Sequence, residues 1–146
     1  DVFRYFGLGC RSVSKLYIPE GYDFANLLGV LDNYRNIMDH TKYRNNYEYN
    51  RSIYLLNNVI HFANDCLMLV EHESMLSRIS SVHYEYYNNL ADLQVLLETK
   101  TDEIQCIATN MNIYGLNTVR LGETQSPSLG DFADSLDTME FLITLK

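Results

Sequence analysis

The chain has 146 residues, of which 47% are hydrophobic and 21% charged, and its formal net charge is −8. This length suits one ordinary domain with its own core, and the composition excludes wholesale disorder. The charge opposes binding of a long polyanion, so nucleic acid is not an expected partner. No apolar stretch approaches the ~18 residues of a membrane-spanning helix, so no transmembrane segment is expected.

The hydrophobic pattern of the first half predicts a strand and two helices. The strand covers residues 15–18 and is ended by Pro19. A helix capped by Asp23 follows, with apolar residues at helical spacing as far as Met38. A weaker helix pattern covers 47–56.

The same alternation continues downstream. The remaining predicted elements, in chain order, are strands at 66–70 and 81–87, a helix capped by Asn89, strands at 104–108 and 118–121, and a helix or pairing strand at 137–145. Interleaved strands and helices favour an α/β fold, with a layered, largely parallel sheet and flanking helices. No repeat or linker divides the chain, so residues 1–146 are predicted to form a single domain.

The most informative residue is Cys10, which follows a glycine-lined turn and precedes the first predicted strand. Gly7 and Gly9 permit unusual backbone conformations and are expected to leave space for a substrate at the sulfur. Arg11 and Lys15 add positive charge nearby, which favours the reactive thiolate over the thiol. The pattern therefore favours a nucleophilic role for Cys10.

The other two cysteines are predicted to be inert. Cys66 and Cys106 lie in apolar runs, where a buried free thiol is the usual state. Three widely spaced cysteines do not resemble a secreted disulfide framework, and no amino-terminal signal pattern is present, so a cytoplasmic location is expected. The alternative for Cys10 itself is the same structural role, as a small turn residue without chemistry.

The segment around Cys10 resembles the nucleophile motif of the aldehyde dehydrogenase superfamily, in which Gly-x-x-Cys is followed by a basic residue and an apolar strand. Gly7, Cys10 and Lys15 occupy those positions, whereas Leu8 stands where most members carry glutamine. The chain is similar over a longer span to one branch, the bioluminescence-type long-chain acyl-CoA reductases. The segments that carry this likeness are residues 1–11, 84–87 and 131–142.

This resemblance implies an oxidoreductase that works through a thioester intermediate. Cys10 would attack an acyl-CoA and expel coenzyme A, and the acyl-enzyme would be reduced to a fatty aldehyde by NADPH or NADH. The backbone N–H of Cys10 would be one oxyanion donor. Gly7, Gly9 and Arg11 would contact the substrate, and Glu123 would lie on a late loop near the substrate entrance.

In the superfamily the cofactor-binding lobe, a second oxyanion donor and a general base precede the nucleophile. Residues 1–146 are therefore expected to be a catalytic lobe alone, unable to turn over substrate by itself. No Gly-x-Gly-x-x-Gly motif opens a helix after a strand. The resemblance leaves homo-oligomerisation open.

Other interpretations stay open at this point. One is a catalytically silent α/β interaction module, and another is a relative that acts on free aldehydes or acyl phosphates. The four histidines lack metal-ligand spacing, so no metal site is predicted. Acidic residues three apart predict a solvated helical face. They are Asp131, Asp134, Asp137 and Glu140.

Overall fold

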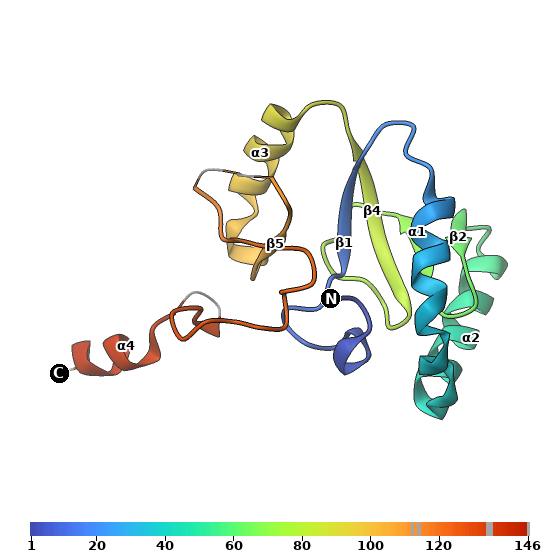
Figure 1. Cartoon of the computed structure of the whole chain (residues 1–146), viewed down its shortest axis with the longest axis horizontal. Coiled ribbons are helices and arrows are strands. Elements are labelled where there is room, and N and C mark those ends of the chain that lie inside the picture. Colours follow the sequence, from blue (N-terminus) through green and yellow to red (C-terminus); the bar gives the residue numbers. More distant parts are fainter. Residues whose placement is uncertain (112, 114, 134–135, 146) are drawn as a thin grey trace.

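The structure is a computed structural model that describes residues 1–111, 113, 115–133 and 136–145. Its centre is a four-stranded sheet with the order β1-β4-β3-β2 (Figure 1). The strands are β1 (Lys15–Pro19), β2 (His61–Ala63), β3 (Met68–Glu71) and β4 (Ser81–Tyr87). Strand β4 pairs in parallel with both β1 and β3, whereas β2 pairs antiparallel with β3. The predicted α/β class is confirmed, and the sheet is mixed.

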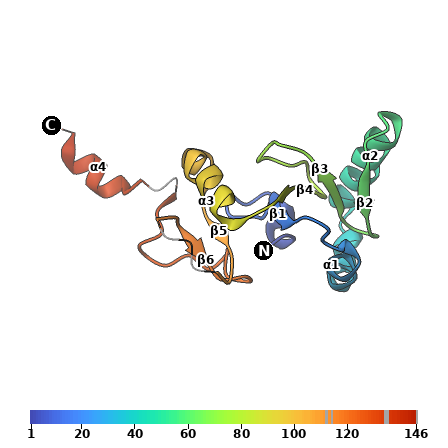
Figure 2. The same cartoon turned by 90° about the horizontal axis from the view of Figure 1, so that it is seen from above.

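Helices α1 (Phe24–Leu31) and α2 (Thr41–Leu56) cover opposite faces of this sheet (Figure 2). Leu67 and Leu69 belong to the apolar cluster on the α1 side, and Met68 and Val70 to the one on the α2 side. Since successive side chains of a strand point to opposite faces, a strand covered on both sides is apolar throughout. This double burial explains the unbroken apolar run that ends at Val70.

The predicted helix from Asp23 to Met38 is divided. The Asp23 carboxylate accepts the Ala25 N–H at 2.9 Å and caps α1 as expected. The chain then tightens into a 3₁₀ segment, η2 (Asp32–Asp39). The Asn33 side chain donates to the Val30 carbonyl at 3.0 Å, which illustrates how aspartate and asparagine compete for the backbone bonds of a helix.

Strand β2 was not predicted, because it has three residues and lies at an edge with two of them exposed. The turn after it depends on Asn64. Its Oδ1 accepts the N–H groups of Cys66 at 3.0 Å and Leu67 at 2.8 Å, and its amide donates to the Leu28 carbonyl at 3.1 Å. One side chain therefore fixes the start of β3 and its distance from α1.

The second half of the chain forms smaller elements beyond β1 (Figures 1 and 2). They are α3 (Leu90–Thr99), the 3₁₀ turn η3 (Thr101–Glu103), the parallel pair β5 (Ile107–Ala108) and β6 (Thr118–Val119), and α4 (Thr138–Thr144). Asn89 caps α3 by accepting the Asp92 N–H at 2.8 Å, as predicted. Strands β5 and β6 are shorter than the sequence pattern indicated.

The carboxyl-terminal segment 137–145 is helical rather than a pairing strand. Asp137 caps α4 by accepting the N–H groups of Met139 and Glu140. Asp131 precedes this helix and accepts the Ser128 N–H at 2.7 Å, so the prediction of one acidic helical face through Asp131 is wrong. Asp134 lies outside the described residues. In the described part of the chain, no helix has the length and apolar character needed to cross a membrane.

Candidate functional site

Cys10 lies at the tip of a tight turn between the 3₁₀ segment η1 (Arg4–Gly7) and strand β1. The Ser12 N–H donates to the Gly9 carbonyl at 2.8 Å, which makes Cys10 and Arg11 the two central residues of a β-turn. Cys10 is exposed. The turn therefore presents this residue to solvent immediately before the first strand of the sheet.

The two glycines of the motif permit the tight path of the backbone around the turn. Gly7 has a φ of +73°, in the left-handed region that favours glycine. A Cβ on Gly9 would lie 3.2 Å from Ser12 Oγ and 3.4 Å from the Tyr5 ring, so protein atoms already fill that side. The expected contact of Gly9 with a substrate stays a prediction, and on this side of the residue no room for a substrate is left. The lack of a side chain on Gly9 allows the Ser12 hydroxyl and the Tyr5 ring to approach its Cα closely.

Arg11 is buried, unlike its exposed neighbour Cys10. Only 8% of its surface is exposed, and its Nε donates to the Thr124 carbonyl at 2.5 Å. The substrate contact expected of Arg11 stays a prediction, and the burial of its guanidinium gives that contact no support. Its Nη2 is buried without a hydrogen-bond partner among the described residues.

The loop of residues 120–125 packs against this turn, although more than a hundred residues separate the two in sequence. The Asp1 carboxylate accepts the Gly122 N–H at 2.6 Å, the Thr124 N–H at 3.2 Å and the Thr124 hydroxyl at 2.8 Å. Glu123 stands between these two anchored residues, with its own side chain exposed. The structure thus brings the loop of Glu123 to the segment that carries Cys10.

Asp1 and Thr124 were not identified from the sequence. An acidic residue and a threonine far apart in the chain carry no local motif, and hydrogen bonds across such a separation have no periodic pattern. The turn signal at Gly122 predicts a loop but not where the loop packs. Thr124 is nevertheless among the most buried polar residues, with 1% of its surface exposed.

Lys15 directs its charge away from Cys10. Its Nζ lies 2.6 Å from Glu85 Oε2 on β4 and also donates to the His72 carbonyl, and its side chain is 4% exposed. The ion pair links β1 to β4 within the sheet. A contribution of Lys15 to the thiolate of Cys10, as the sequence predicted, receives no support from this arrangement.

The three thiols differ in exposure. Cys66 is fully buried, as predicted, and burial raises the pKa of its thiol to about 11. Cys106 is half-buried rather than buried. Burial raises the pKa of the Cys106 thiol, and the positive charge of Arg11 opposes that shift. Cys10 is the exposed member of the three.

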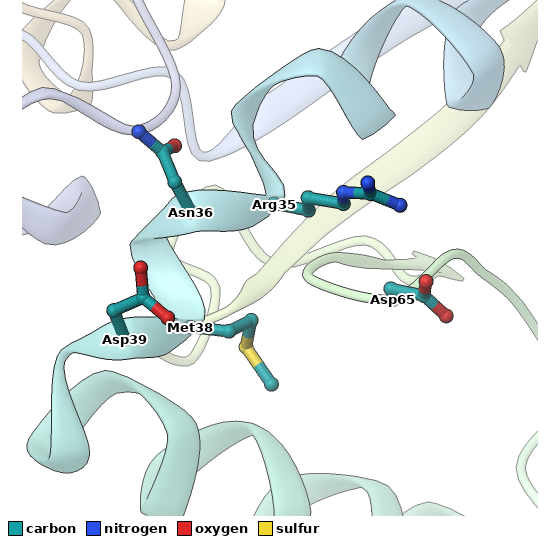
Figure 3. Close-up of a pocket in the computed structure, with 5 residues that line it drawn as sticks. All are labelled: Arg35, Asn36, Met38, Asp39 and Asp65. Atoms are coloured by element: carbon teal, nitrogen blue, oxygen red, sulfur yellow. The ribbon is translucent and has the colours of Figure 1, made fainter.

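Two hollows lie elsewhere in the structure. An open one of about 500 Å³ is lined by Arg35, Asn36, Met38, Asp39 and Asp65, and Figure 3 shows Arg35 and Met38 extending from η2 toward the turn that carries Asp65. A narrow cavity of about 10 Å³ lies beside Gly7, enough for about one water molecule. Cys10 lines neither hollow.

The geometry therefore assembles part of the predicted site. Cys10 is presented to solvent, Glu123 lies on the loop that packs against the Cys10 turn, and Arg11 is turned inward to hold the two together. Within the described ranges, no group of three His, Cys, Asp or Glu side chains could hold a metal ion. No protein-family model, curated protein or solved structure matches this chain.

Proposed function

We propose that the chain is the catalytic lobe of a nicotinamide-dependent reductase of long-chain acyl-CoA thioesters, related to the aldehyde dehydrogenase superfamily, with Cys10 as the acyl acceptor. The observation that carries the proposal is the exposure of Cys10 at a tight turn, whereas burial raises the thiol pKa of Cys66 and Cys106. A thiol that is both accessible and free is the kind that nucleophilic catalysis requires. The motif resemblance around Gly7 and Cys10 supports the same assignment.

The step proposed for this chain is acylation. The Cys10 thiolate attacks the thioester carbonyl, the bond from that carbon to the sulfur of coenzyme A breaks, and coenzyme A leaves as a thiolate that takes a proton from solvent. The product is an acyl thioester on Cys10. The Cys10 backbone N–H stabilises the oxyanion that forms during the attack, and Glu123 lies toward the substrate entrance.

The residues of this chain do not fit a dinucleotide site, because no glycine-rich phosphate-binding motif follows a strand and opens a helix. The nicotinamide cofactor would supply the hydride that converts the acyl thioester into an aldehyde. No residue here is assigned to that reduction.

The test is acyl transfer to the purified chain. Palmitoyl-CoA is added near neutral pH, and intact mass with peptide mapping follows the adduct. We expect one palmitoyl group on Cys10, with an equal amount of coenzyme A released. Cys10→Ser should abolish the adduct, and the matched variant Cys106→Ser should retain it. Absence of an adduct, or its even distribution over the three cysteines, would refute the proposal.

Substrate class is tested in the same assay. Palmitoyl phosphate replaces palmitoyl-CoA at equal concentration, and the rate of acylation at Cys10 is compared. Hexadecanal, which without an oxidant can only add to the thiol as a thiohemiacetal, is the control that should leave no acyl group. The proposal requires the fastest acylation from the coenzyme A thioester. Faster transfer from the acyl phosphate would assign a different reaction to the same thiol.

Slow alkylation of Cys10 by iodoacetamide, no faster than that of Cys66 and Cys106, would favour an interaction module without chemistry.

A further inference from the structure

We propose that Arg11 and Thr124 are positioning residues, which act together as a clamp that holds the Cys10 turn against the loop of residues 120–125. This inference rests on the proposed function, because it concerns how the acyl acceptor is held. The clamp consists of the Arg11 Nε bond to the Thr124 carbonyl and the Asp1 carboxylate that binds Gly122 and Thr124. It acts on Cys10 through the backbone and does not touch the substrate.

The first argument is the relation of Arg11 to Cys10 in the turn. They are the two central residues of one β-turn, closed by the Ser12 N–H bond to Gly9. Anchoring the Arg11 side chain inside the protein fixes the backbone of the turn, and with it the direction of the neighbouring Cys10 side chain. The Cys10 side chain is therefore oriented although, among the described residues, it makes no fixing contacts itself. Such contacts would limit the access of a substrate to its sulfur.

The second argument is the choice of arginine. A guanidinium is planar, and its Nε donates in a fixed direction, which a lysine ammonium does not reproduce. The charge of Arg11 also reaches groups outside the turn. It is one of the groups that lower the pKa of the Asp131 carboxyl, after the hydrogen bonds from Ser128, and it opposes the rise in the pKa of the Cys106 thiol. The hydrogen bond to the Thr124 carbonyl fixes the guanidinium against the loop of residues 120–125.

The third argument is the burial of Thr124. Its hydroxyl and its N–H both bind the Asp1 carboxylate, its carbonyl accepts from Arg11, and 1% of its surface is exposed. The Gln125 side chain adds a longer bond of 3.4 Å to Ser12 Oγ. Every polar group of Thr124 is therefore engaged in joining two distant segments, and valine at this position keeps the shape while it removes the hydroxyl bond.

The experiment compares Arg11→Lys, Thr124→Val and Thr124→Ser in the full chain. Acylation of Cys10 by palmitoyl-CoA and the pH profile of Cys10 alkylation by iodoacetamide are both measured. We expect acylation to fall about tenfold in Arg11→Lys and Thr124→Val, because small misplacements of a nucleophile cost rate. The pH midpoint of Cys10 alkylation should be the same in these variants as in the unmodified chain. Thr124→Ser, which keeps the hydroxyl, should acylate at the rate of the unmodified chain. Arg51→Lys, an exposed arginine on α2, is the control.

The outcomes separate the clamp from its alternatives. Wild-type acylation rates in Arg11→Lys would overturn the clamp, and so would a shifted alkylation midpoint, since the role would then be electrostatic. If the unmodified chain takes no acyl group, the proposed function fails, and the clamp is judged by amide hydrogen exchange. Faster exchange of residues 9–13 in Thr124→Val than in the unmodified chain supports it, and unchanged exchange overturns it.

Discussion

Two tyrosines of α2 satisfy buried carbonyls around Cys66. Tyr43 donates its hydroxyl to the Cys66 carbonyl at 2.9 Å, and Tyr47 donates to the Asn64 carbonyl at 2.6 Å. Both rings are buried, and burial raises the pKa of both hydroxyls, so they remain protonated donors over the physiological range. Specific hydroxyl bonds at the start of β3 thus hold α2 to the sheet in addition to apolar contact.

Replacement of Tyr43 by phenylalanine tests this bond. Tyr43→Phe keeps the ring and leaves the Cys66 carbonyl without the donor, so the free energy of unfolding should fall by about 1–3 kcal/mol. Urea unfolding followed by far-ultraviolet circular dichroism measures the change. Tyr49→Phe is the matched control, because Tyr49 lies on the same helix with an exposed ring. Equal effects of the two substitutions would show that the buried hydroxyl contributes nothing.

The buried thiol of Cys66 leads to a prediction about the stability of the fold at alkaline pH. Its thiol pKa is about 11 in the folded chain, whereas an unfolded cysteine ionises near pH 8.5, so between these values the unfolded state has lost a proton that the folded state keeps. Stability is therefore complete below about pH 8.5 and should fall by roughly 1–2 kcal/mol by pH 10. Urea titrations across this range measure the decline. Cys66→Ala should reduce the decline to the part that other groups contribute, such as the Cys106 thiol, whose pKa burial also raises, while Cys10→Ala, which retains Cys66, should keep it in full.

At the scale of elements, the ion pair between Lys15 and Glu85 joins β1 to β4. Lys15 is 4% exposed and Glu85 is 32% exposed at the side chain, so the pair is only partly shielded from solvent. Removing one partner of a shielded pair leaves the other charge buried and uncompensated, which costs more than the pair itself contributes. The pair also fixes the strand that follows the Cys10 turn.

A double-mutant cycle tests this pair. Glu85→Gln should lower the free energy of unfolding by about 1–3 kcal/mol, less than for a fully buried pair because Glu85 reaches solvent. Lys15→Met combined with Glu85→Gln should recover most of that loss, since no charge then remains buried. Chemical denaturation of the four chains of the cycle gives the coupling free energy. Additive effects of the two substitutions would show that the charges do not interact.

Elements with a local signal could be predicted from the sequence. Asp23 and Asn89 mark the helix starts correctly, and the apolar run that ends at Val70 marks the most buried strand, because caps and burial depend on neighbouring residues. Strand β2 and the 3₁₀ segment η2 could not be predicted in this way. The first exists only through its pairing with β3, and the second depends on how α1 joins α2.

At the scale of the whole molecule, the candidate site could likewise be predicted only where it depends on residues that are close in sequence. The exposed Cys10 turn follows from a motif of adjacent residues, but the burial of Arg11 depends on Thr124 and Asp1, which are 123 residues apart in the chain. Charge near a thiol in sequence is therefore a poor guide to charge near it in space. Lys15 and Arg11 both lie within five residues of Cys10 in sequence, and the charge of each is bound to another partner.

The position of α4 leads to the last prediction. All seven of its residues are exposed, and Figures 1 and 2 show it projecting away from the sheet. A chain that ends at Ala133 should therefore unfold at the same urea concentration as the full chain, because the described residues that it lacks, 136–145, include none that is buried. A chain that ends at Val119 should be less stable, since it also loses the bonds of Thr124 to Asp1 and Arg11. Equal destabilisation by both truncations would contradict this division, and would indicate that α4 packs against the sheet in solution.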